Sequence, residues 1–134
     1  MNAISHLKQR KELQNMQILK TSLTDDILKY SFMNSPENLK LSEIPEGTLL
    51  HISDFVLYER EYNGENRKHI SIAVEQPDNT IRVYVTNSQT FITEFEGILS
   101  VFCDDCNKLK EHSVKILKGT SKKGRTFITC TLVP

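Results

Sequence analysis

The chain lacks the features that mark membrane, secreted and disulfide-rich proteins. It has 134 residues, no tryptophan and three cysteines. An odd number of cysteines argues against a disulfide framework and fits a reducing compartment. No apolar run approaches the roughly 18 residues of a membrane span, and the N-terminus "MNAISHLKQRKELQNM" lacks the apolar core of a secretory signal. We therefore expect a cytoplasmic protein with one compact domain, no membrane partner and at most one appendage.

A net charge is also absent, because 17 Lys and Arg balance 17 Asp and Glu. A neutral chain gives no global signal for binding nucleic acid or an anionic membrane. The charges are nevertheless unevenly distributed. Residues 43–65 hold six acidic residues and one cation, whereas residues 112–134 hold five cations and no acid. We therefore expect a local basic patch near the C-terminus.

Signals for catalysis and for metal binding are equally sparse. The sequence shows no nucleophile–base set, no phosphate-binding glycine loop and no paired carboxylates, so we expect neither an enzyme nor a cofactor. Cys103 and Cys106 form a single "CDDC" pair that invites a metal or redox interpretation. A zinc site usually needs two such pairs, so we interpret both cysteines as apolar residues that extend a helix stripe, and we predict no metal site.

The pattern becomes β-rich after the turn formed by Pro45 and Gly47. A long strand is expected over residues 48–61, and its apolar alternation changes parity near Ser53 and Asp54. A β-bulge at that point explains the change. The strand ends before Asn63-Gly64, the strongest short-range signal for a hairpin in the chain.

Four more strands follow, at residues 68–76, 80–86, 113–118 and 125–132, and the first two of these show period-two alternation. In the strand at residues 80–86 the alternation places Ile81, Val83 and Val85 on one face. It places Arg82, Tyr84 and Thr86 on the other, outward face. In the last strand it predicts an inward face of Ile128, Cys130 and Leu132, and an outward face of Arg125, Phe127 and Thr129.

One convincing helix is expected between the third and fourth strands, over residues 88–105. Its apolar residues recur at helical spacing: Phe91, Phe95, Ile98, Leu99 and Phe102. Asn87 or Ser88 is a suitable N-cap. Gly97 inside the helix costs about 1 kcal/mol relative to Ala, so we expect a close packing contact there.

Residues 1–40 are assigned to an N-terminal arm and residues 41–134 to the domain. A weak helix is expected over residues 5–23, and a short helix capped at Thr24 or Asp25 and ended by Pro36. Two interpretations remain open: a mobile arm, or an arm that packs on a neighbouring subunit or on a ligand. The arm is the candidate segment for self-association.

The order β-β-β-α-β-β is that of the OB-fold, a five-stranded Greek-key barrel that binds nucleic acid or sugar through its strand 2–3 face and its loops 1–2 and 4–5. Binding of a single strand requires cations that contact its phosphates and aromatic rings that stack on its bases. Residues of both kinds are concentrated on these loops and on strand three. The candidate nucleic-acid-binding residues are Tyr58, Arg60, Tyr62, Arg67, Lys68, Arg82, Tyr84, Lys122, Lys123, Arg125 and Phe127.

Three segments, "IPEGT", "YVTNSQT" and "VKILKGTSKKGRTFITCTLVP", resemble the single-stranded DNA-binding proteins of small protein-primed phages of the phi-29 type. The resemblance extends from about Ile44 to Leu132. It implies a protein that coats displaced strands during replication, with binding tyrosines matched by Tyr58, Tyr62 and Tyr84. The acidic residues around the first strand and the Cys103–Cys106 pair depart from the family pattern.

Alternatives of other classes stay open at this point. A conjugative plasmid or integrated element could use the same arrangement, and an OB-type protein-interaction module would explain the domain without nucleic acid. Stacking and phosphate contacts do not read the 2′-hydroxyl, so both DNA and RNA are candidate partners.

Overall fold

The computed structural model describes residues 16–134. The elements follow in the order β1 Met16–Thr21, α2 Asp26–Asn34, β2 Leu39–Lys40, the 3-10 turn η1 Leu41–Glu43, β3 Leu49–Tyr62, β4 Glu65–Glu75, β5 Ile81–Thr86, α3 Gln89–Val101, α4 Cys106–Leu109, β6 Ser113–Thr120 and β7 Thr126–Val133. The five expected strands and the long helix are present in the expected order. The strands β1 and β2 and the short helix α4 are additions that the sequence pattern does not predict.

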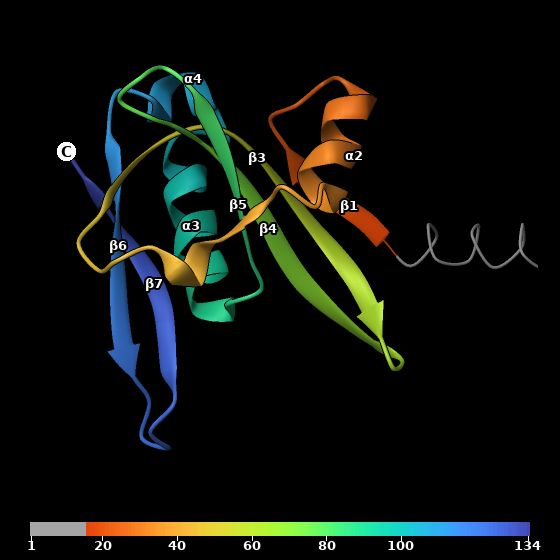
Figure 1. Cartoon of the computed structure of the whole chain (residues 1–134), viewed down its shortest axis with the longest axis vertical. Helices are drawn as coiled ribbons and strands as arrows, with labels where there is room; N and C mark the ends of the chain where they lie inside the picture. The colour runs from red at the N-terminus through yellow and green to blue at the C-terminus, as the bar shows by residue number, and fades with distance from the viewer. Residues whose placement is uncertain (1–15) are drawn as a thin grey trace, which may run out of the picture.

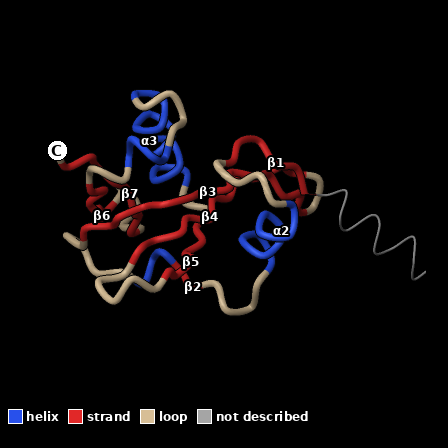
Figure 2. Tube along the Cα trace, turned by 90° about the horizontal axis from the view of Figure 1, so that it is seen from above, coloured by secondary structure: helices blue, strands red, loops and turns tan. Residues whose placement is uncertain are grey.

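The strands form one curled, open sheet with the order β2-β5-β4-β3-β6-β7, and β1 pairs separately with β3 (Figure 2). β3 has three neighbours because it is long: Leu49 and Leu50 pair with β6, residues 51–62 pair with β4, and residues 56–60 pair with β1. Among residues 16–134, no pairing joins β5 to β7. The protein is therefore mainly β, and its sheet forms a half-barrel.

A β-bulge in β3 is confirmed at the predicted place. Ile52 pairs with Val74 and Asp54 pairs with Ala73, so Ser53 is the extra residue. An extra residue rotates the following side chains to the other parity. The bulge thus lets β3 contribute to the main core along its whole first half, with Leu50, Ile52, Phe55 and Leu57.

α3 packs against the sheet through the expected stripe, with Phe91, Phe95 and Leu99 fully buried. Its N-cap is Ser88, whose hydroxyl oxygen accepts a hydrogen bond from the N–H of Phe91. The expected packing contact at Gly97 is wrong: the residue is exposed, and a Cβ placed on it would meet nothing within 4 Å.

The helix ends four residues earlier than expected, at Val101. The chain then turns through Cys103 and Asp104, which have positive φ angles of 53° and 60° and so cannot continue a right-handed helix. Cys103 is exposed and Cys106 is buried. The expectation that both cysteines extend the stripe of α3 is therefore wrong: Cys103 is exposed, and Cys106 joins the main core from a separate helix, α4.

α2 covers the face of the sheet opposite to α3 (Figure 2). Its N-cap is Asp25, one of the two predicted caps, whose side chain accepts hydrogen bonds from two backbone N–H groups, and the helix ends at Asn34 before Pro36. Its Phe32 lies in a second apolar cluster with Val56, Tyr58 and Ala73. The described part of the arm thus packs on the domain.

The weak helix expected over residues 5–23 is corrected where the structure describes it. Residues Met16–Thr21 form the strand β1, antiparallel to β3. Pairing with the free edge of β3 satisfies backbone groups that a marginal helix would have to satisfy alone. The remainder of that expectation, residues 5–15, lies outside the described residues.

Candidate nucleic-acid interface

Two β-hairpins extend from the same end of the protein (Figure 1). The first joins β3 to β4 through Asn63 and Gly64, whose φ angles of 50° and 80° form the tight turn that this dipeptide favours. The second joins β6 to β7, and the N–H of Ser121 donates to the carbonyl of Arg125 at 2.8 Å to close it. These two turns are the loops in which the sequence predicts a binding site.

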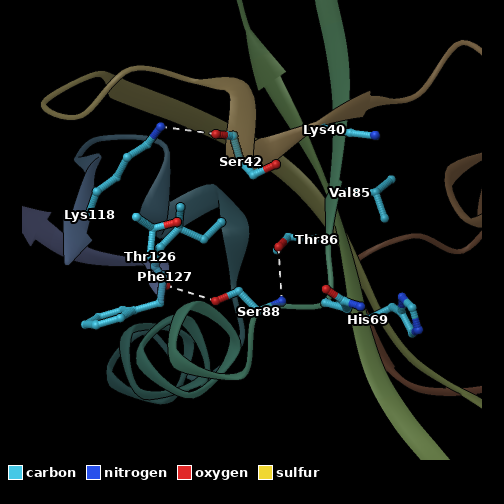
Figure 3. A pocket seen from close by; sticks show the side chains of 11 residues that line it. Lys40, Ser42, His69, Val85, Thr86, Ser88, Lys118, Thr126 and Phe127 are labelled. Carbon is cyan, nitrogen blue, oxygen red and sulfur yellow. Dashed lines mark hydrogen bonds between the residues drawn. The ribbon is translucent and has the colours of Figure 1, made fainter. Parts of the chain in front are cut away.

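A cavity of about 610 Å³ connects the strands of the two hairpins. It extends from β6 and β7, past the end of β5, to His69 on β4. Figure 3 shows Ser42, Lys118 and Thr126 on one side of β5, and Lys40, Val85 and His69 on the other. An elongated anion in this cavity would therefore meet a lysine on each side of the strand.

Side chains bridge the open seam between β5 and β7. The hydroxyls of Ser88 and Thr90, at the start of α3, both donate to the carbonyl of Ile128, at 2.9 and 2.5 Å. The ammonium of Lys118 donates to the carbonyl of Ser42 at 3.1 Å. These contacts hold the two edges of the sheet near each other without strand pairing, and the cavity lies between the edges.

The turn of the β6–β7 hairpin carries the expected basic patch. Lys122, Lys123 and Arg125 are all exposed, and none of them forms an ion pair with a residue of the described chain. Gly124 between them has a φ of 78°, which a residue with a side chain rarely adopts. The turn therefore presents three cations to solvent.

The cations of the β3–β4 hairpin have protein partners. Arg67 lies 3.6 Å from Glu65, and Lys68 lies 3.3 Å from Glu96 of α3. The guanidinium of Arg60 donates to the side chain of Asn34 on α2 at 3.3 Å. A phosphate would have to compete with these partners, so this hairpin is a weaker anion site than its counterpart.

The predicted tyrosines have different surroundings. Tyr62, next to the first turn, is 48% exposed and suits base stacking. Tyr58 is only 2% exposed because α2 and its cluster cover it, and burial raises its pKa. The expectation that Tyr58 is a stacking surface is therefore corrected to a structural role.

The predicted orientation of β5 is reversed. Tyr84 pairs with Ile72, whose side chain lies in the main core, so Tyr84 faces the same side and packs against that core. Arg82 pairs with Val74 and also lies on this side, although it is exposed. Val83 packs instead on the cluster under α2. Because the arm covers the second face, apolar residues occupy both faces of β5 and alternation alone cannot assign them.

Tyr84 is also separated from the hairpin cavity. It lines a different cavity, of about 590 Å³, together with residues near Pro45, His51 and Pro77. Neither Tyr84 nor Arg82 lines the cavity between the hairpins. Of the sequence-predicted residues, only Phe127 lines the cavity between the hairpins, and Arg67 and Lys68 line a separate pocket beside it.

Phe127 faces outward, as predicted, at the edge of the cavity. Its neighbour Ile128 is buried, whereas Phe127 is half-buried. Its ring points away from the centre of the cavity (Figure 3). A base could reach this ring only along the outer face of the β6–β7 hairpin.

His69 is a cavity residue that the sequence pattern does not single out. Its ring stacks on Tyr58 with a centroid distance of 5.4 Å and an interplanar angle of 15°, and it lies 6.1 Å from the ring of Tyr62. Burial, followed by Arg60 and Arg67, lowers its pKa. A histidine opposite a tyrosine in a predicted hairpin is the only sequence signal that could have indicated it.

Residues 16–134 contain no group of three or more His, Cys, Asp or Glu side chains arranged to hold a metal ion. No helix in the same range has both the length and the apolar character needed to cross a membrane. Comparisons with protein-family models, with curated proteins and with solved structures found no significant match.

Proposed function

We propose that the protein is a sequence-nonspecific single-stranded DNA-binding protein of the OB-fold type, which coats exposed strands during the replication of a phage or another mobile element. The observation that carries the proposal is the cavity that connects the two hairpins, with Lys40 and Lys118 on either side of β5. OB-folds bind oligonucleotides with the loops between strands one and two and between strands four and five. In this proposal the β3–β4 and β6–β7 turns correspond to these two loops, with β3 counted as the first strand and β1 and β2 as additions.

The strand pairing supports an OB-type arrangement in part. β3 pairs with both β4 and β6, and β6 pairs with β7, as the first, second, fourth and fifth strands of such a barrel would. The seam between β5 and β7 departs from it, since β2 pairs with β5 where a closing strand would lie. In this proposal the open seam widens the binding cleft.

The chemistry of the site favours a flexible single strand over a duplex. The exposed cations Lys122, Lys123 and Arg125 suit phosphates, and the exposed ring of Tyr62 suits a base that is free to stack. Stacking of this kind is worth roughly 1–3 kcal/mol per base. The proposal involves no catalysis, and it leaves RNA as a competing ligand because no 2′-hydroxyl contact is assigned.

The test is a titration with oligo(dT) and with a duplex of equal charge, at low and moderate salt, followed by tyrosine emission. The chain has four tyrosines and no tryptophan, so the signal needs no label. We expect quenching by the single strand, a weak response to the duplex, and an affinity that falls as salt rises because counterions are released. Quenching by neither ligand would overturn the proposal.

We also propose that the arm mediates self-association. Five of the ten exposed large apolar side chains of the described chain lie within residues 16–34: Ile18, Leu19, Ile27, Leu28 and Tyr30. Light scattering after gel filtration, for the full chain and for an Ile27→Ser/Tyr30→Ser variant, tests this. A monomer in both cases would reject it.

A further inference from the structure

His69 occupies an unusual position in the hairpin cavity. It lines the cavity on the same side of β5 as Lys40 and Val85 (Figure 3). Its Nε2 atom is buried and has no hydrogen-bond partner among residues 16–134. A buried polar atom without a partner is costly, and such atoms in native structures often have a functional reason.

The groups around His69 are cations and aromatic rings. Its cross-strand partner is Tyr58, and the next pair on the same face of the sheet, towards the turn, is Arg60 with Arg67. The nearby carboxylate of Glu65 already pairs with Arg67 at 3.6 Å. The ring of Tyr62 lies 6.1 Å from that of His69, and Lys40 lines the same cavity as His69. The charged groups that act on His69 are therefore the guanidinium groups of Arg60 and Arg67.

This setting disfavours a charged imidazole in the free protein. Removal from water destabilises the imidazolium, and the two guanidinium groups repel it, so the pKa of His69 lies below its ordinary value of 6.5. An anion in the cavity would have the opposite effect, because its charge stabilises the imidazolium and offsets the two arginines. The effect acts through the field and needs no direct hydrogen bond.

From this geometry we infer that His69 is a proton-linked ligand contact of the interface: the single strand binds with uptake of a proton on His69, so that binding strengthens as the solution becomes more acidic. The inference rests on the proposed function, since it needs a polyanion in the cavity. The sign follows from linkage. At a pH above the pKa of His69 in both the free protein and the complex, the ring is neutral in both and does not contribute to affinity. As the pH falls through the higher pKa of the complex, the affinity increases. Below the lower pKa of the free protein the ring is charged in both states, and the affinity levels off.

The experiment measures the affinity for oligo(dT) between pH 5.0 and 8.0 at constant ionic strength, together with calorimetry in two buffers of different ionisation enthalpy. Each unit by which binding raises the pKa of His69 increases the affinity by up to about tenfold at acidic pH. We expect a gain of about threefold or more, accompanied by net proton uptake near pH 6, since the gain and the uptake have the same origin.

Two substitutions test whether His69 causes the proton uptake and the pH dependence of binding. His69→Phe keeps a ring on Tyr58 but cannot titrate, and His69→Gln keeps a polar group; both should lose the proton uptake and the acid-side gain. His51→Gln is the matched control, because His51 is exposed and lies at the other end of β3, away from the cavity. Circular dichroism before each titration verifies folding.

The outcomes separate this inference from the proposed function. Binding of oligo(dT) with the same pH dependence in the wild type and in both His69 variants would overturn the role of His69 and leave the proposed function standing. An absence of binding at every pH would overturn both. If the His51 variant lost the pH dependence, the titrating group would be His51 and not His69, and the inference would also be rejected.

Discussion

The aromatic ring of Phe127 lies directly over Gly119 on the neighbouring strand. The two residues are paired across β6 and β7, and a Cβ placed on Gly119 would lie 2.5 Å from Cζ of Phe127 and 3.0 Å from Cε1 and Cε2. No side chain other than hydrogen leaves room for the ring. This contact explains why β6 has a glycine at position 119, near its end.

We expect Gly119→Ala to displace the ring of Phe127. Overpacking of this kind costs about 1–3 kcal/mol, which outweighs the roughly 0.5–1 kcal/mol that alanine gains over glycine in a strand. In a Phe127→Leu background the clash is relieved, so the same alanine should be neutral or stabilising. Urea unfolding of the four proteins of this double-mutant cycle measures the coupling. If the two changes in the free energy of unfolding were additive, the ring of Phe127 and the side chain at position 119 would not interact.

The two tyrosines of the first hairpin should separate binding from stability. Tyr58 is buried in the cluster under α2, so Tyr58→Ala should lower the free energy of unfolding by about 3–5 kcal/mol, as other buried aromatic truncations do. Tyr62 is about half exposed, so Tyr62→Ala should leave stability within about 0.5 kcal/mol and weaken oligo(dT) binding by roughly 1–3 kcal/mol. Denaturant titration and tyrosine quenching measure both quantities. A Tyr62 variant that binds normally would remove stacking at this hairpin from the proposal.

Local signals in the sequence are sufficient for most of the elements. The bulge at Ser53, the turn at Asn63-Gly64 and the cap at Asp25 each depend on neighbours along the chain, and each is found at the predicted place. The faces of β5 could not be predicted in the same way. They depend on α2, which covers the side of the sheet that period-two alternation treats as exposed.

The candidate site shows the same division between local and tertiary effects. The cations of the β6–β7 turn are exposed as predicted, because a tight turn leaves its side chains in solvent. The partners of Arg60 and Lys68 come from α2 and α3, more than 25 residues away in each case, and no local pattern predicts them. His69 belongs to the cavity only because β5 ends beside it.

Gly97→Ala should stabilise the protein. The residue lies inside α3 with normal helical geometry, is exposed, and has open space where a Cβ would stand. Alanine is favoured over glycine in a helix interior by about 1 kcal/mol, and no contact opposes the gain. Gly124→Ala is the matched control: its φ of 78° makes alanine strained, so it should destabilise. Thermal unfolding measures both, and a loss of stability in Gly97→Ala would reveal a contact that this backbone does not show.

Removal of the two lysines of the β6–β7 turn should weaken binding through electrostatics alone. We expect Lys122→Ala/Lys123→Ala to reduce the affinity for oligo(dT) and to lower the slope of log K against log salt by about 0.7 for each phosphate that is no longer neutralised. Lys108→Ala/Lys110→Ala removes the same charge near α4, at the end of the protein opposite to the hairpins (Figure 1). The control should change the slope little. Equal reductions in affinity from both pairs would mean that net charge, and not the hairpin, determines binding.

The three thiols should react at very different rates in the folded protein. Cys103 is exposed, whereas Cys106 and Cys130 are 5% and 3% exposed, and burial raises their pKa values to about 11 and about 12. The thiolate is the reactive form, so at pH 8 the two buried residues are disfavoured both by access and by protonation. A disulfide reagent added to the native protein should modify one thiol quickly and the other two only after unfolding in urea. Cys103→Ser should abolish the fast reaction, and three fast thiols in the native wild type would contradict the packing of α4 and β7.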